Sequence, residues 1–293
     1  MKKNIFKGSA VAIITPFTKE GIDFDKLGEL IEFQIEEGTA AIVVCGTTGE
    51  ASTMSSEEQK AAIQYTVEKV NKRIPVIAGT GSNNTQHAIA LSQFAQKVAC
   101  DGVLCVTPYY NKTTQKGLYE HFRMIAESIT IPMILYNVPA RTNLNISPQT
   151  VKALSEIENI VGIKECQFSQ VGEIVKLCGS DFAVYSGEDA NILPLLSMGG
   201  MGVISVMANI IPRDTQSITQ KFFEGDLKES LSLQLQTLDL IKALFIETSP
   251  IPVKAALNLM GFNIGSCRMP LVEMEEGHLK LLKDELRRYK LID

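Results

Sequence analysis

Short apolar runs recur along the chain, and each is followed by a longer stretch in which apolar residues recur at helical spacing. This alternation is typical of consecutive βα units built around a parallel sheet. Eight runs fit the strand pattern: GSAVAIITPF (8–17), AAIVVCG (40–46), PVIAGTG (75–81), GVLCVTP (102–108), PMILYNVP (132–139), IVGIKE (160–165), FAVYSG (182–187) and GVISVMAN (202–209). The helical stretches include residues 24–37, 56–71, 85–99, 114–128 and 148–154, several of them opened by a Ser, Thr or Asp cap.

The strand candidates are nearly continuous in apolar residues and rich in Val and Ile, which indicates a sheet covered on both faces. Eight such strands with intervening helices predict an α/β fold, a closed (β/α)8 TIM barrel. A doubly wound open sheet is the alternative, but no G-x-G-x-x-G follows the first run. After about residue 224 only helical patterns remain. We therefore expect a barrel over residues 1–224 and a C-terminal helical appendage over residues 225–293.

Composition narrows the class of protein. Of the 293 residues, 45% are hydrophobic. The chain has 28 basic and 33 acidic residues and a net charge of -5, so its overall charge does not favour binding to nucleic acid or to an anionic membrane. The apolar run at 10–14 is shorter than a signal-peptide core and is followed at once by Pro16, so it predicts a strand. No apolar stretch approaches the ~20 residues of a membrane span.

The cysteines and histidines also limit the chemistry. The six cysteines contain no C-x-x-C pair, and several lie in apolar segments, so we expect reduced thiols in a cytoplasmic protein. The three histidines, His87, His121 and His278, are scattered along the chain without metal-ligand spacing. The sequence therefore predicts no metal site.

The polar residues at the carboxyl ends of the strands should form the site, because that end of such a barrel carries the active site. Lys164 ends the run IVGIKE. If Lys164 faces inward, desolvation lowers its pKa and leaves a neutral amine that attacks a ketone or aldehyde to form a Schiff base. The alternative is a strand-end lysine that reaches solvent or pairs with Glu165. Alternation along the run does not decide between these orientations.

Two further strand ends carry candidate groups. Tyr136 lies at the corresponding level of the preceding run, where it is either a proton shuttle beside the lysine or a core residue with its hydroxyl at the rim. The stretch GTTGE places Thr47 and Thr48 between Gly46 and Gly49. Backbone N–H groups and hydroxyls in such a loop suit a small carboxylate, although the same residues also make an ordinary βα turn.

Two loops complete the candidates. Arg141, in VPARTN after the fifth run, suits a second carboxylate, unless it is simply a solvated surface cation. The glycine-rich SMGGMGVIS (197–205) suggests a phosphate-binding loop as an alternative, since barrels often bind phosphate near strands seven and eight. Its glycines precede the eighth run and so fall on the opposite face, where a tight turn after a helix explains them.

Taken together, GTTGE, TPYYNKTTQKGLYEHF, LYNVPARTN, GIKE, YSGEDA, GVISVMAN and PIPVKAAL closely resemble the dihydrodipicolinate synthase family, within a superfamily of class I pyruvate aldolases and lyases. The resemblance spans nearly the whole chain. It implies that Lys164 forms a Schiff base with pyruvate and that the enamine attacks L-aspartate-4-semialdehyde. The product then cyclises with loss of water to 4-hydroxy-tetrahydrodipicolinate, the first committed step towards diaminopimelate and lysine. It implies that no cofactor is needed.

The resemblance also implies the roles of other residues. Tyr136, Thr47 and Tyr110 form a proton relay, with Tyr110 reaching into the site of the neighbouring subunit. A dimer interface around Tyr109 and Tyr110 is expected, doubled into a homotetramer.

The substrate-binding residues follow by the same resemblance. Thr48 holds the pyruvate carboxylate, and backbone around Gly187 and Ile204 lines the pocket. Arg141 recognises the carboxylate of the semialdehyde.

Two alternative functions are considered, one within this superfamily and one outside it. The nearest is another pyruvate-dependent aldolase, such as N-acetylneuraminate lyase or a keto-deoxy sugar-acid aldolase. The N-acetylneuraminate lyases typically have GSTGE where this chain has GTTGE. They also lack the counterpart of Arg141, whose charge selects an acidic acceptor. A barrel that only binds a keto acid is the remaining alternative, because fold alone does not establish chemistry.

The chain departs from the family at a few positions. Asn143 replaces the usual Gly after RT, and we expect the same turn because Asn tolerates a left-handed backbone. Ser249 replaces the usual Asn before PIPVK, at no catalytic position.

The site at which feedback-sensitive relatives bind lysine is also altered. Asn83 and Tyr109 match it, but Ser56 and Gln59 replace histidines, and His87 replaces the glutamate that would hold the lysine ammonium. We therefore expect weak or absent inhibition by lysine.

Overall fold

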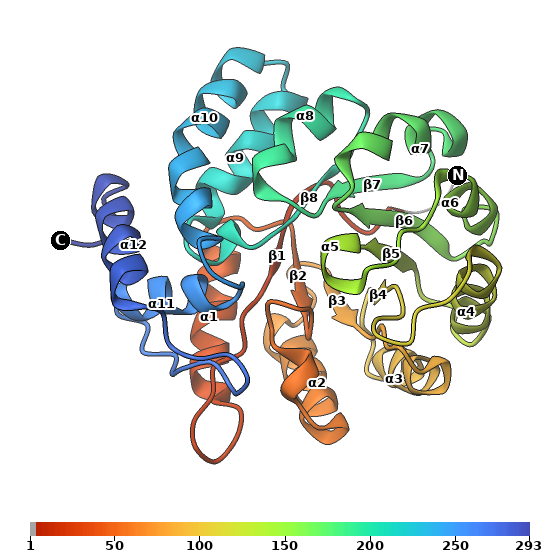
Figure 1. The fold of residues 1–293 in the computed structure, drawn as a ribbon, viewed down its shortest axis with the longest axis horizontal. Coiled ribbons are helices and arrows are strands. Elements are labelled where there is room, and N and C mark those ends of the chain that lie inside the picture. Colours follow the sequence, from red (N-terminus) through yellow and green to blue (C-terminus); the bar gives the residue numbers. More distant parts are fainter. Residues whose placement is uncertain (1–3) are drawn as a thin grey trace.

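The computed structural model describes residues 4–293 and shows a closed barrel of eight parallel strands in chain order, with β8 pairing back to β1 (Figure 1). The strands are β1 (Gly8–Ala12), β2 (Ala41–Val44), β3 (Val76–Gly79), β4 (Gly102–Val106), β5 (Met133–Asn137), β6 (Ile160–Glu165), β7 (Ala183–Ser186) and β8 (Gly202–Ser205). The predicted (β/α)8 barrel is confirmed, and the open doubly wound sheet is excluded.

Helices follow the strands and, apart from the short α5 (Pro139–Thr142) at the mouth, cover the outside of the barrel (Figure 1). They are α1 (Phe24–Glu36), α2 (Ser56–Val70), α3 (Thr85–Lys97), α4 (Gln115–Glu127), α5 (Pro139–Thr142), α6 (Pro148–Leu154), α7 (Val171–Cys178), α8 (Ile192–Ser197) and α9 (Pro212–Phe223). Side-chain caps fix several of their starts; Ser55 forms a capping box with Glu58, and Asp23 and Thr114 accept from the first turns of α1 and α4.

Three more helices follow the barrel: α10 (Leu227–Leu244), α11 (Ile251–Leu259) and α12 (Glu276–Arg288). They form the predicted helical appendage and gather on one side of the barrel (Figure 1), where α10 packs against α9 and α12. Short 3-10 turns η1 (Ala51–Thr53), η2 (Phe168–Gln170), η3 (Asp189–Asn191) and η4 (Met207–Asn209) follow strands β2, β6, β7 and β8. Among residues 4–293, no helix is both long and apolar enough to cross a membrane.

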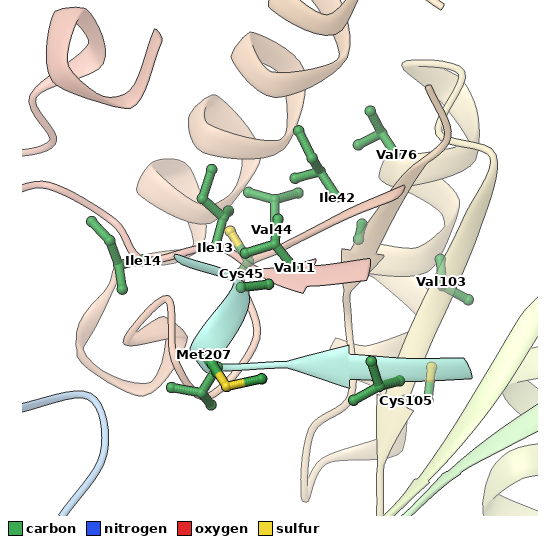
Figure 2. Close-up of a cluster of buried hydrophobic side chains, with 14 of the residues drawn as sticks. Val11, Ile13, Ile14, Ile42, Val44, Cys45, Val76, Val103, Cys105 and Met207 are labelled. Carbon is green, nitrogen blue, oxygen red and sulfur yellow. The ribbon is translucent and has the colours of Figure 1, made fainter. Parts of the chain in front are cut away.

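The apolar side chains form an inner and an outer core. The inner core fills the barrel with small and branched residues such as Ala10, Val43 and Ile204. The outer core lies between strands and helices, and Figure 2 shows Val44 and Val103 in a part of it. Strands buried on both faces explain the continuous apolar runs of the sequence.

Several strands are shorter than their predicted runs, because side chains replace the backbone ladder at the ends. The run 8–17 becomes β1, which ends at Ala12, and the run 202–209 becomes β8 followed by η4. Asn209 explains both ends: its Nδ2 donates to Ala12 O at 2.9 Å, and its Oδ1 accepts from Ile14 N at 3.1 Å. Single-sequence patterns do not reveal such a long-range cap.

Candidate functional site

A bulge in β6 turns Lys164 into the barrel. The pairing of β5 with β6 shifts so that Met133 pairs with Ile160, whereas Ile134 pairs with Gly162. The extra residue, Val161, packs in the inner core, and the alternation then restarts, so Lys164 faces inward as well. Lys164 pairs with Tyr136 on one side and Tyr185 on the other, both inner-core residues.

The environment of Lys164 favours a neutral amine. Its side chain is buried, with Nζ 4.5 Å from the centroid of the Tyr136 ring. Burial lowers the pKa of Lys164, and the Arg141 charge lowers it further, while Cys166 and Asp189 act in the opposite direction. The sequence alternative, a pair with Glu165, does not occur: Glu165 alternates to the outer side and accepts hydrogen bonds from Asn137 Nδ2 and Gln170 Nε2, each at 2.8 Å.

Tyr136 lies at the same level of β5, as the sequence predicts. Its side chain is buried and forms hydrogen bonds with Thr47 and Cys166. Burial raises the pKa of the phenol above its ordinary value, and the hydrogen bond with Thr47 offsets part of this rise. The phenol is therefore neutral near pH 7 and in contact with a second hydroxyl, which suits passage of a proton.

The stretch GTTGE forms a tight turn between β2 and η1. Glu50 N donates to Thr47 O at 3.0 Å, and Thr15 Oγ1 donates to Gly49 O at 2.8 Å. Thr47 is exposed as a residue, whereas Thr48 is buried. Glu50 itself is buried and forms an ion pair with Lys254 at 2.7 Å.

Arg141 belongs to the short helix α5 rather than to an irregular loop. Asn143 caps the C-terminus of α5 with a φ of 51°, which confirms the expected left-handed turn. Arg141 Nη2 donates to Ser249 O at 3.1 Å, which links the barrel to the C-terminal helical region. The rest of the guanidinium side chain is exposed at the mouth of the site.

Gly187 follows β7 close to Lys164. A Cβ at Gly187 would overlap Cys166 Sγ and lie 3.3 Å from Lys164 Cε, so a larger residue would displace the Cys166 side chain. Ile204 is fully buried on β8. Gly187 therefore lies close to Lys164, and Ile204 belongs to the inner core of the barrel.

A cavity of about 390 Å³ opens at this end of the barrel. Its lining includes Thr47, Tyr136, Arg141, Tyr109 and His87, but not Lys164, Thr48, Gly187, Ile204 or Tyr110. The cavity thus joins part of the predicted site to the region of His87. Tyr110 is 93% exposed with a φ of 68°, and it projects from the chain instead of completing this chain's own cavity.

Two residues near Lys164, Cys166 and Asp189, were not predicted from the sequence as site residues. Cys166 contacts Tyr136, and burial raises the pKa of its thiol to about 11. Asp189 is buried and accepts from Ser205 Oγ at 2.5 Å and from Met207 N at 2.9 Å, which joins η3 to the end of β8. Asp189 stands within the quoted motif YSGEDA, so a signal was present, whereas nothing in the sequence distinguishes Cys166 from the other thiols.

The glycines of SMGGMGVIS make a turn and not a phosphate loop. Gly199 N donates to Leu196 O and Gly200 N to Leu195 O, each at 3.0 Å, which caps the end of α8. Gly202 begins β8 with a φ of 154°. Over residues 4–293, no group of three or more His, Cys, Asp or Glu side chains is arranged to hold a metal ion.

The chain is similar to known proteins in both sequence and structure. The model of the "Dihydrodipicolinate synthetase family" matches residues 5–289. The 4-hydroxy-tetrahydrodipicolinate synthase of Acetivibrio thermocellus is 65% identical over 292 residues, which cover 100% of both chains. Among solved structures, the dihydrodipicolinate synthase of Aquifex aeolicus is 46% identical with a TM-score of 0.96, covering 98% of this chain and 99% of that one. The Acinetobacter baumannii enzyme, described as complexed with pyruvate, is 42% identical with a TM-score of 0.96, covering 99% and 100%.

Proposed function

This chain belongs to the dihydrodipicolinate synthetase family, and we propose that it condenses pyruvate with L-aspartate-4-semialdehyde to give 4-hydroxy-tetrahydrodipicolinate. It is an enzyme of lysine and diaminopimelate biosynthesis. One observation carries the choice of chemistry: Lys164 is a buried amine with a lowered pKa, set against the ring of Tyr136 inside the barrel.

The Lys164 amine would attack the carbonyl carbon of pyruvate, and loss of water would give the imine. Removal of a methyl proton then gives an enamine, whose terminal carbon forms the new bond with the aldehyde carbon of the semialdehyde. The aldehyde oxygen becomes the hydroxyl of the product. The amino group of the semialdehyde closes the ring at the former carbonyl carbon, and Lys164 leaves as the free amine.

Proton transfers in these steps are assigned to Tyr136, Thr47 and Tyr110. The hydrogen bond between Tyr136 and Thr47 supports the first part of this relay. The exposure of Tyr110 supports the second, because a side chain that projects from one subunit is free to enter the site of another.

Substrate recognition is assigned to two carboxylate sites. Thr48 and the turn around it would hold the pyruvate carboxylate, with Gly187 and Ile204 as the walls beside Lys164. Arg141 would pair with the carboxylate of the semialdehyde, since its side chain is exposed at the mouth and lines the cavity.

The assembly is proposed to be a homotetramer built from dimers that meet around Tyr109 and Tyr110. Both tyrosines are exposed, at 38% and 93%, and aromatic side chains are enriched at such interfaces. The barrel over residues 1–224 would carry the chemistry and residues 225–293 would support it. We place the enzyme in the cytoplasm, where its free thiols stay reduced.

Inhibition by lysine is proposed to be weak or absent. Gln59 and His87 line the cavity where the lysine-sensitive pattern has a histidine and a glutamate. Gln59 Nε2 donates to Ala51 O at 2.7 Å, so its amide is held by the protein itself. His87 offers no anion to a lysine ammonium.

The purified protein tests the function through its choice of acceptor. Pyruvate consumption would be measured with L-aspartate-4-semialdehyde or with N-acetylmannosamine, and pyruvate with borohydride would be used to trap the imine. Turnover with the semialdehyde alone and a mass increase at Lys164 are expected, both lost in Lys164→Ala and retained in the control Lys152→Ala, at a partly exposed lysine of α6. Turnover with N-acetylmannosamine would favour the aldolase alternative, and no trapping would favour a barrel without this chemistry.

A further inference from the structure

We propose that the buried ion pair between Lys254 and Glu50 positions the Thr47–Thr48 turn for the pyruvate carboxylate. The two side chains are 2% and 0% exposed, with Lys254 Nζ 2.7 Å from Glu50 Oε1. Lys254 lies on α11, so the C-terminal helical region is part of the framework of the site. The proposal rests on the proposed function, because it assigns a positioning role within that same reaction.

The C-terminal helical region holds the Glu50 carboxylate at several points. Lys254 Nζ donates to Oε1, and Arg268 N donates to Oε2 at 2.8 Å. The Cys267 side chain also forms a hydrogen bond with the carboxylate. Lys254 Nζ donates in addition to Ser266 O at 3.1 Å, so the lysine is itself held in place. One residue of the turn is thus anchored to the segment between α11 and α12.

The backbone conformation of Glu50 explains why the turn needs such an anchor. Glu50 has a φ of 55°, a left-handed conformation that residues other than glycine rarely adopt without support from their surroundings. Glu50 N closes the turn on Thr47 O at 3.0 Å, so a change in the Glu50 backbone moves the two threonines. The position of Glu50 is therefore coupled to the position of the hydroxyls.

The location of the ion pair favours positioning over stability. A buried ion pair is weak evidence for stability, because well-packed apolar residues of similar volume often serve as well. A charged pair instead fixes direction and distance, which an apolar contact does not. The pair joins residues 204 positions apart and lies beneath the turn that carries Thr47 and Thr48.

The same segment reaches the other side of the site. Ser249 O, five residues before Lys254, accepts the hydrogen bond from Arg141 Nη2. Lys254 and Ser249 thus hold the turn proposed for pyruvate and the arginine proposed for the semialdehyde. The C-terminal helical region therefore sets the relative position of two elements that the barrel strands support separately.

Three variants test the proposal: Glu50→Gln, Lys254→Met and the two combined. Lys242→Met is the matched control, since Lys242 is an exposed lysine of the same helical region paired with Asp239. For each protein, kcat and KM for pyruvate, borohydride trapping at Lys164, and the thermal midpoint would be measured. The double variant leaves no charge unpaired, so it separates loss of the anchor from the destabilisation that an unpaired buried charge causes.

The expected result is a loss of kcat/KM for pyruvate on the order of 10- to 100-fold in Lys254→Met and in the double variant, mainly through KM. Trapping at Lys164 should persist at saturating pyruvate, because β6 keeps the amine in place. Glu50→Gln should lose less but still measurably, since its amide oxygen accepts from Lys254 whereas its amide nitrogen cannot accept from Arg268 N. Lys242→Met should match the wild type.

A folded double variant with wild-type KM and kcat would overturn the proposal, as would a variant that lost thermal stability alone. If Lys254→Met does not fold, the double variant decides, and if that also fails, a wild-type KM in Glu50→Gln decides against the anchor. Absence of trapping in the wild type would instead overturn the proposed function, so the two failures are distinguishable.

Discussion

The buried carboxyl of Glu165 should make the enzyme less stable as the pH rises through neutrality. Burial raises the pKa of Glu165 from 4.5 to about 7, although hydrogen bonds from Gln170, Gln167 N and Asn137 oppose the rise. The folded protein therefore holds a proton on Glu165 between these two values, where the unfolded chain releases it. The stabilisation from this protonation is complete below pH 4.5 and is lost as the pH rises through 7.

The expected magnitude follows from the two pKa values. The pKa values of 4.5 and about 7 differ by about 2.5 units, and each unit corresponds to 1.36 kcal/mol, so the full loss is about 3 kcal/mol. Glu165→Gln removes the titrating group, so the free energy of unfolding of the wild type relative to this variant should fall by about that amount between about pH 4 and about pH 8.

Urea denaturation at a series of pH values measures this difference. Glu158→Gln, at an exposed position just before β6, is the matched control and should follow the wild-type pH dependence. Parallel curves for the wild type and Glu165→Gln would refute the reasoning. A difference that grew in favour of the wild type at higher pH would mean that the hydrogen bonds, and not burial, dominate the pKa.

Three further predictions concern the site. Tyr136→Phe should lower kcat on the order of 100-fold in the pyruvate assay while borohydride still traps pyruvate at Lys164; unchanged kcat would exclude the proton relay. Gly187→Ala should lower kcat/KM, because its Cβ would overlap Cys166 Sγ, and adding Cys166→Ala should restore activity; no rescue would remove the steric explanation. The wild type should keep its activity in sub-millimolar lysine, whereas His87→Glu should become more sensitive; strong inhibition of the wild type would contradict the assignment of that surface.

The barrel could be predicted because its signals are local. Continuous apolar runs identify strands buried on both faces, and Ser, Thr and Asp caps mark where helices begin. The limits of the strands were less predictable. Asn209, for example, ends the ladder of β1 from almost 200 residues away, and no local pattern announces that contact.

The sequence could name candidates for the site, but it could not show the contacts that support them. Lys164, Tyr136 and the GTTGE turn stand at strand ends, where barrel topology alone directs attention. The ion pair of Glu50 with Lys254 joins two quoted motifs, yet the sequence does not show that they meet, because the contact is made by the tertiary packing of α11.

The orientation of Lys164 shows why alternation failed where topology succeeded. A regular strand with Val161 facing inward would turn Lys164 outward, since three positions separate them and side chains alternate with a period of two. The shift in pairing at Met133 and Ile134 adds one residue to β6 and restores the inward direction. The pattern of apolar residues does not predict this direction. The bulge turns Lys164 into the apolar interior of the barrel, where burial lowers the pKa of the amine. Removing one residue from 160–162 should accordingly turn the amine away from Tyr136 and abolish trapping, even if the barrel still folds.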